Sequence, residues 1–304
     1  MVTLILSDVI DDPMDIIASG PTIPNSVTKL EVLQLLEKYK LKHKIPLSIL
    51  SHLQADEETN PHPQCPIKDG CYPHTQNIIV GNNRTATEAA LAAAEGLGYS
   101  CLVWSHCIQG EARDIGSLYA KITHLLLTKQ RKFNCANLLQ EEAVKVLLNS
   151  TPQVMRDDLA TLIEQLSQLN SRPLCLISAG EPTVTVKEGT SGVGGRSQEL
   201  ALSYAMELER LCVSSSLTDS NTRQSECVFA SVGTDGQDGP GCDAAGALVD
   251  MNVTRLADEA QMSPGSFLEN HDSYTFSQLD SGRYLIQTGL TGTNVMDIHI
   301  VLIT

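Results

Sequence analysis

Residues 77–105 read NIIVGNNRTATEAALAAAEGLGYSCLVWS, and this stretch decides the predicted fold. The apolar run at 77–83 predicts a strand and a turn. The alanine-rich run at 84–98 predicts a helix that ends at Gly98, and 99–105 predicts a second strand. A strand, a helix with a glycine stop and another strand are typical of a βαβ unit, in which the two strands lie parallel in one sheet. The chain is therefore predicted to belong to the α/β class.

Both flanks of this stretch continue the alternation of strands and helices. Apolar β-branched runs predict strands, and leucines or alanines at helical spacing predict helices. A pair of strands is expected around the turn Gly180-Glu181-Pro182 in residues 172–186. Further strands are predicted at 1–9, 227–233, 282–289 and 296–304, and helices at 27–41, 46–53, 111–127, 196–211, 243–250 and 254–261.

The pattern predicts two α/β/α sandwich domains with mostly parallel sheets. A polar, helical segment at 126–171 is expected to connect residues 1–125 with residues 172–304. Because the first strand starts at Met1, the N-terminus resembles a cut point inside a domain, and the first domain is predicted to be incomplete.

Composition and charge exclude several functions. The 304 residues are 42% hydrophobic and 19% charged, as in an ordinary globular protein, and the formal net charge is −15. Affinity for nucleic acid or for an anionic membrane requires a basic surface, so neither partner is expected. No apolar run of the sequence is long enough to span a bilayer.

The cysteines indicate a reducing compartment. There are nine of them, and none forms a C-x-x-C pair, which is typical of free thiols in the cytoplasm or the mitochondrial matrix. His62, Cys65, Cys71 and His74 have residue types that suit zinc. The favoured interpretation of this cluster is a proline-rich surface loop without metal.

A glycine-rich stretch, GEPTVTVKEGTSGVGGRSQEL at 180–200, predicts an anion site. Gly192, Gly194 and Gly195 allow bare backbone N–H groups to face a ligand, and a helix beginning near Arg196 adds its positive N-terminal end. Arg196 itself can bind a carboxylate or a phosphate with two parallel donors. The run matches neither the P-loop nor the G-x-G-x-x-G pattern. The alternative is a flexible hairpin followed by a helix whose first arginine is solvated.

A second stretch, GTDGQDGPGCDAAG at 233–246, places carboxylates in a glycine-dense turn. Asp235, Asp238 and Asp243 could supply oxygen ligands to Mg²⁺, or one of them could orient a hydroxyl group. The alternative is ordinary turn chemistry, because Asp-Gly pairs are common in tight turns.

Two more polar loops follow apolar strands, at 7–22 and 291–294. Ligands of open parallel sheets sit at the carboxyl ends of strands, so the four loops are expected to converge on one cleft. Asp8 lies where strand gives way to loop, with a helix cap or turn as the alternative role. Of the histidines, His106 and His299 are predicted to lie at the edge of the core and not to act as bases.

Taken together, four motifs resemble those of the two-domain glycerate 2-kinases, whose C-terminal half is the MOFRL domain. The motifs, in family order, are SDVIDDPMDIIASGPT (7–22), AGEPTVTV with GGRSQELAL (179–202), GTDGQDGPGCDAAGA (233–247) and TGTN (291–294). The resemblance implies transfer of phosphate from ATP, with Mg²⁺, to D-glycerate in a cleft between two α/β domains. It also implies that 1–125 is the C-terminal part of the family's Rossmann-like first domain and 172–304 the MOFRL domain.

The resemblance assigns roles to individual residues. Asp8, Arg196 and Asp235 are implied as catalytic, Asp8 by orienting the attacking hydroxyl group, and Asp235 and Asp238 as Mg²⁺ ligands. Substrate- or phosphate-binding roles are implied for Ser7, Ser19, Gly20, Thr22, Gly180, Glu181, Gly192, Gly194, Gly195, Gln198, Glu199, Thr234, Gly236, Gly239, Thr291, Gly292, Thr293 and Asn294. The expected location is cytoplasmic, or mitochondrial for a longer form, and a homo-oligomer is a possible assembly.

The sequence departs from the family at three places. Asp11 replaces a glycine before Asp12-Pro13, and Ser197 replaces the usual asparagine after GGR. The chain also has no counterpart of the family's N-terminal glycine-rich loop and catalytic lysine. Two alternatives therefore stand beside a glycerate kinase: a truncated, non-catalytic isoform that acts in binding, and a metal-dependent hydrolase.

Overall fold

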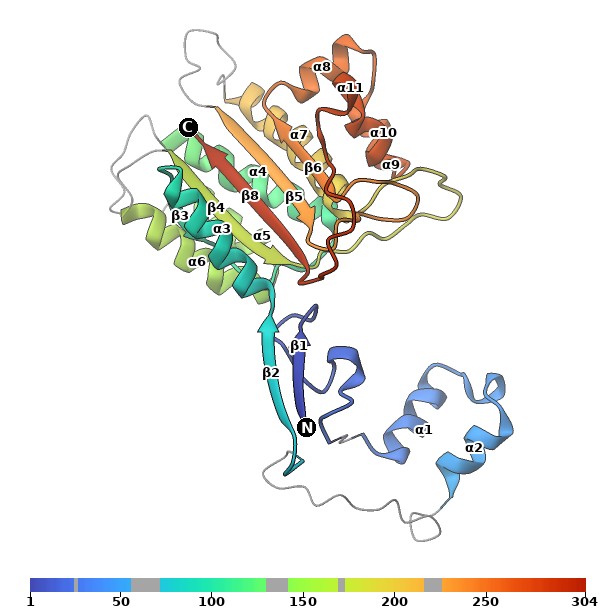
Figure 1. Cartoon of the computed structure of the whole chain (residues 1–304). Coiled ribbons are helices and arrows are strands. Elements are labelled where there is room, and N and C mark those ends of the chain that lie inside the picture. The colour runs from blue at the N-terminus through green and yellow to red at the C-terminus, as the bar shows by residue number, and fades with distance from the viewer. Residues whose placement is uncertain (25–26, 56–71, 130–141, 169–172, 216–225) are drawn as a thin grey trace. The chain divides into compact units, whose positions relative to one another are not determined.

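The computed structural model describes residues 1–24, 27–55, 72–129, 142–168, 173–215 and 226–304. Their contacts divide the chain into two compact units (Figure 1). Unit 1 comprises Met1–Ile5 and Asp12–Val80, and unit 2 comprises Leu6–Asp11 and Gly81–Thr304. The candidate zinc residues His62, Cys65 and Cys71 lie outside the described residues.

Unit 1 is built from a small sheet and two helices. Strands β1 (Val2–Leu6) and β2 (Gln76–Gly81) form this sheet, and helices α1 (Lys29–Lys38) and α2 (Leu47–Gln54) occupy positions that the sequence predicts. Thr28 and Glu31 cap α1 reciprocally through side-chain and backbone contacts. On one face of the small sheet, alternate apolar side chains are exposed, at Val2, Leu4, Leu6, Ile78 and Val80.

Unit 2 contains a six-stranded sheet, called here the large sheet, in the order β3-β4-β8-β5-β6-β7. Its strands are β3 (Ser100–Val103), β4 (Leu174–Gly180), β5 (Cys227–Gly233), β6 (Gly246–Asp250), β7 (Leu285–Ile286) and β8 (Asp297–Ile303). β8, the last strand of the chain, lies between β4 and β5 and is antiparallel to both.

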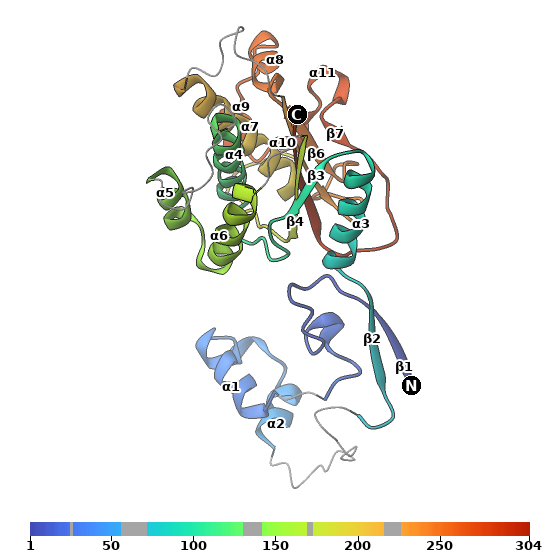
Figure 2. The same ribbon diagram turned by 90° about the vertical axis from the view of Figure 1, so that its left-hand side faces the viewer.

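Helices cover both faces of the large sheet (Figure 2). One face carries α3 (Asn83–Gly96), and the other carries α4 (Ala112–Lys129) and α7 (Arg196–Ser214), which pack closely on each other. The remaining helices are α5 (Glu142–Ser150), α6 (Gln153–Gln168), α8 (Val253–Glu259), α9 (Pro264–Glu269), α10 (Ser273–Ser277) and α11 (Leu279–Gly282).

The core of unit 2 lies between the large sheet and the α4–α7 layer. Tyr204 and Phe229 stack there with ring centroids 4.5 Å apart, and Tyr119 packs against the same phenylalanine. His299 on β8 is fully buried in this layer, where its Nδ1 lies 3.1 Å from the hydroxyl of Ser231. His299 is expected at the edge of the core, but it lies in the interior.

The α/β class is confirmed, but the expectation of mostly parallel sheets is wrong for the large sheet. Of its strand pairs, β3–β4 is parallel and the others are antiparallel. The segments of the predicted βαβ unit form as expected, yet β2 pairs with β1 and β3 pairs with β4, in different sheets. The physical reason is that strand pairing depends on segments distant in sequence, above all β8, more than on the local sequence pattern.

Three further expectations differ from the structure. Residues 243–250 are predicted as a helix from their alanines, but the segment pairs with β5 and supplies β6. Residues 181–186 do not form a second strand, apart from a single bridge between Glu111 and Thr183. The connecting segment at 126–171 contributes α5 and α6, which bury Val144, Leu159 and Ile163 in the core of unit 2.

The two units are defined by contacts within the chain, and the chain passes from one to the other near residue 80. The domain boundaries at residues 125 and 171, which the family resemblance implies, stay a prediction. Within the described ranges, no helix combines the length and apolarity that crossing a membrane requires.

Candidate functional site

Arg196 is held between the ends of two neighbouring strands of the large sheet. Its Nε and Nη2 donate to the two carboxylate oxygens of Asp297 at 2.6 and 2.9 Å, and its Nη1 donates to Glu181 at 2.7 Å. Asp297 opens β8, and the register places it opposite Gly180, the residue before Glu181. The guanidinium is thus clamped at the edge of the sheet where β4 ends.

This cluster of one guanidinium and two carboxylates is partly buried. The side chain of Asp297 is 2% exposed, and that of Arg196 is 32% exposed. Burial raises the pKa of Asp297, and the ion pair with Arg196 acts in the opposite direction. Burial lowers the pKa of Arg196, but the contacts with Asp297 and Glu181 outweigh it and raise that pKa above its usual value. Arg196 stays charged, and three of its five N–H bonds are directed at carboxylates.

Asp238 occupies the N-terminus of α7. Its carboxylate accepts the backbone N–H groups of Ser197 at 3.0 Å and Gln198 at 2.8 Å, and the side-chain amide of Gln198 at 2.9 Å. Asp238 is 4% exposed. The positive end of this helix therefore already faces a buried anion supplied by the chain.

The predicted Mg²⁺ pair does not fit this arrangement. Both oxygens of Asp238 receive N–H donors, and the group is enclosed, so it is poorly suited to a hydrated metal ion. Burial raises the pKa of Asp238 to about 6, against the effect of those hydrogen bonds. Over the part of the chain that the structure describes, no group of three or more histidine, cysteine or acidic side chains could hold a metal.

The glycines before Arg196 are packed against other main chain. A side chain at Gly192 would collide with the carbonyl groups of Asn270 and His271, and one at Gly195 would collide with Asp238. The N–H of Val193 donates to the carboxylate of Asp272 at 3.0 Å. The glycine content of this loop therefore follows from close packing within unit 2, and an open array of ligand-facing amides is not needed to explain it. Gly194 and Gly239 also approach each other closely, so the two glycine-rich stretches are in contact.

The loop after β5 and the loop before β8 lie together, as expected. The N–H of Thr291 donates to the carbonyl of Asp235 at 3.1 Å, and its hydroxyl donates to the carbonyl of Thr234 at 2.6 Å. Gly236 approaches the main chain of Gly289. Asp235 is half-buried and accepts the N–H of Gln237 in a local turn. Its negative charge adds to the effect of burial in raising the pKa of Asp297. Within the same turn, the hydroxyl of Thr291 accepts the N–H of Thr293, and Asn294 accepts that of Met296.

The predicted residues of the N-terminal loop have mixed environments. Ser7 is buried, and its hydroxyl donates to the carbonyl of Val9 at 3.2 Å, whereas Asp8 is exposed. Ser19, Gly20 and Thr22 belong to unit 1, where Thr22 donates to Asn77 at 2.6 Å. The contacts of Arg196 with Glu181 and Asp297 do not include Asp8, so the role of Asp8 stays a prediction.

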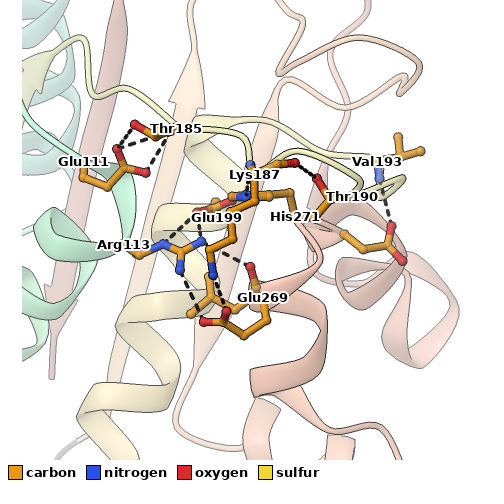
Figure 3. A network of polar contacts seen from close by, with 11 residues as sticks. Glu111, Arg113, Thr185, Lys187, Thr190, Val193, Glu199, Glu269 and His271 are labelled. Atoms are coloured by element: carbon orange, nitrogen blue, oxygen red, sulfur yellow. Dashed lines mark hydrogen bonds and ion pairs between the residues drawn. The ribbon is translucent and has the colours of Figure 1, made fainter.

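Glu199 lies in an interior network that the sequence does not reveal. It is 2% exposed, accepts Nε and Nη2 of Arg113 at 3.2 and 3.0 Å, and lies 2.9 Å from Nδ1 of His271 (Figure 3). Its neighbour Gln198 is fully buried. Arg113, His271 and Asp297 are absent from the predicted site, since each lies in a segment without a glycine-rich motif.

With the geometry described, similarity to known proteins decides the family. A glycerate kinase of Macaca fascicularis is 36% identical over 305 aligned residues, which cover 100% of this chain and 72% of that protein. The chain belongs to the glycerate kinase family. Residues 174–297 match the MOFRL family, and residues 1–54 match a domain of unknown function, DUF4147.

More distant members of the glycerate kinase family agree. The glycerate 2-kinase of Pyrococcus horikoshii is 29% identical over 100% of this chain and 56% of its own length. The crystal structure of a glycerate kinase from Thermotoga maritima aligns with a TM-score of 0.69 at 28% identity, covering 100% of this chain and 57% of that one. The chain thus spans a little over half the length of these two relatives.

Proposed function

We propose that the chain acts as a glycerate kinase, transferring the terminal phosphoryl group of ATP to D-glycerate to give 2-phosphoglycerate. The observation that carries this proposal is the clamp of Arg196 by Asp297 and Glu181. It lies at strand ends, in a chain that is 36% identical throughout to a protein named glycerate kinase. Ligands of open α/β sheets usually lie at the carboxyl ends of strands, and Glu181 directly follows the carboxyl end of β4.

Phosphoryl transfer needs mainly positioning and charge neutralisation from the protein. The two N–H bonds of Arg196 that are not directed at carboxylates would bind an anionic group, either the glycerate carboxylate or a phosphate of ATP. Asp297 would keep the guanidinium in one orientation. The paired loops around Thr234 and Thr291 would line the same end of the sheet, and Asp8 is proposed to orient the attacking hydroxyl group.

Mg²⁺ is the usual companion of ATP, but Asp238 does not fit as its ligand, so no step of this proposal passes through a protein-bound metal. A reducing compartment is proposed from the cysteine pattern; among the described cysteines, the buried Cys175 is a free thiol.

The test is an assay of 2-phosphoglycerate formation from ATP and D-glycerate with the chain as given. Arg196→Ala should lower kcat/KM by at least about 100-fold, because a charge-assisted contact in the transition state is lost. Arg210→Ala is the matched control on the same helix, since Arg210 is 62% exposed and pairs with Glu207.

Equal activity of the two arginine variants would refute the assigned role of Arg196. A chain that binds ATP but forms no product would favour the non-catalytic alternative, and release of phosphate from esters without ATP would favour a hydrolase.

A further inference from the structure

Side chains from other segments bind the loop between Glu181 and Arg196 through a polar network (Figure 3). At its start, the N–H and hydroxyl of Thr185 both donate to Glu111 at 2.9 Å. At its end, the N–H of Val193 donates to Asp272. In the middle, Lys187 is held twice: its backbone N–H donates to Nε2 of His271 at 3.2 Å, and its ammonium group pairs with Glu269.

The contact with His271 differs from the others because the imidazole is buried. The side chain of His271 is 7% exposed, whereas that of Glu269 is 61% exposed. An exposed ion pair contributes little to holding a loop, since solvent screens it. A hydrogen bond between a buried group and the main chain is screened far less. The middle of the loop is therefore fixed chiefly through His271.

The contacts determine the tautomer of His271. A backbone N–H can only donate, so Nε2 accepts from Lys187 and carries no proton. Nδ1 lies 2.9 Å from a carboxylate oxygen of Glu199, which can only accept, so Nδ1 carries the proton and donates it. Both nitrogens of the imidazole are therefore engaged.

Glu199 is in turn held by Arg113, which matches its negative charge inside the protein. Arg113 comes from α4, Glu199 from α7, and His271 from the turn between α9 and α10. The backbone of His271 is itself constrained, with φ of 53°. Three packed elements thus fix the orientation of one ring, and that ring fixes the loop.

We propose that His271 is a positioning residue for the reaction of the proposed function. It holds the main chain at Lys187 and thereby fixes both ends of the loop, Glu181 at one end and the backbone around Gly192–Gly195 at the other. These two ends keep Arg196 aligned for an anionic substrate group. This inference rests on the proposed function. His271 touches no reacting atom and acts through the loop.

The variant that tests the contact is His271→Asn. Asparagine tolerates a positive φ, and its side-chain amide can donate to Glu199 as Nδ1 does, but it is too short to reach Lys187. Hydrogen exchange at the Lys187 amide should become at least about 10-fold faster, while amides in β5 and β8 keep their protection. The matched control is Lys187→Ala, which removes the exposed ion pair with Glu269 and keeps the backbone N–H.

The link to the reaction is tested by steady-state kinetics. His271→Asn should raise KM for glycerate or ATP by about 10-fold with a smaller change in kcat, and Lys187→Ala should leave both near the unaltered values. Unchanged exchange at Lys187 in His271→Asn would overturn the proposal. Faster exchange with unaltered KM and kcat would also overturn it, because His271 would then have a structural role alone.

The exchange measurement needs no turnover, so it separates this inference from the proposed function. If the unaltered chain forms no product, calorimetric titration with ATP replaces the kinetics. An affinity about 10-fold weaker in His271→Asn would then support the positioning of the loop for an anionic ligand, and equal affinities would overturn it.

Discussion

At the scale of single residues, Arg196 shows what a sequence can and cannot reveal. Its place after a glycine run and at a helix start predicts an anion-binding arginine, and Glu181 is predicted to belong to the same site. Asp297 is not predicted as a site residue, because it lies 101 residues from Arg196 in sequence. Its segment shows only the alternation of apolar residues that predicts a strand. The available signal is that Asp297 shares the buried face of β8 with Val301 and Ile303, where a charged side chain requires a partner.

Removing the charge of Asp297 should destabilise the protein. Asp297→Asn leaves Arg196 partly buried with one carboxylate, and we expect the free energy of unfolding to fall by about 2 kcal/mol. Fully buried pairs cost about 3–5 kcal/mol to break, and the exposed part of Arg196 reduces the effect. Urea denaturation followed by circular dichroism measures it. Asp235→Asn is the control; an equal loss of stability there would contradict a special role for the clamp.

His299 predicts a specific dependence of stability on pH. Burial lowers its pKa from 6.5 to about 3, so the folded protein keeps the ring neutral while the unfolded chain takes up a proton as the pH falls below 6.5. Its contribution to stability is therefore present above pH 6.5 and is lost progressively between pH 6.5 and 3. By pH 4.5 the loss from this group should reach about 3 kcal/mol.

The comparison variant is His299→Gln, whose side chain does not titrate. The advantage in unfolding free energy of the unaltered chain over this variant should shrink as the pH falls from 7 to 4.5. An advantage that stays constant over this range would show that His299 does not titrate as described.

At the scale of elements, α7 shows how a predicted helix can have an unpredicted cap. The helix begins at Arg196, as its sequence indicates, and Gly195 at the cap position has no side chain to accept the first N–H groups. Asp238 supplies that acceptor from the loop after β5. In the structure, the carboxylate of Asp238 accepts the N–H groups at the start of this helix, so a capping role accounts for the aspartate in this glycine-rich stretch.

Truncation of Asp238 should weaken the start of α7. Asp238→Ala leaves two backbone N–H groups and the amide of Gln198 buried without their acceptor, and we expect a loss of about 3 kcal/mol in unfolding free energy. Guanidinium chloride denaturation compares it with Asp243→Ala, which removes a surface contact with Tyr274. Similar midpoints for the two variants would rule out the capping role.

Strands were harder to predict than helices where local preference and pairing disagree. The alanines of residues 243–250 favour a helix, yet the main-chain groups of β6 pair with β5 on one side and β7 on the other. Strand formation depends on partners that are distant in sequence, so a window of eight residues does not contain the deciding information.

At the scale of the whole molecule, the two contact units differ in how much they bury. Among the described apolar side chains of unit 1, Ile17 is buried, whereas the large core from Trp104 to Ile303 lies in unit 2. Apolar burial is the main favourable contribution to folding, so unit 1 should open far more often than unit 2.

Limited proteolysis tests this difference. Thermolysin should cut first within residues 27–55, and a fragment containing the large sheet should persist; mass spectrometry locates the cuts. Early cleavage inside α4 or α7 would contradict the assignment of the stable core to unit 2.

The central place of β8 also governs the order in which unit 2 can be completed during synthesis. β4 and β5 are joined through Asp297–Ile303, which follows both of them in sequence, so a nascent chain must wait until this strand leaves the ribosome before those two can be joined. Synthesis that stops before Asp297 would therefore leave β4 and β5 without the strand that joins them.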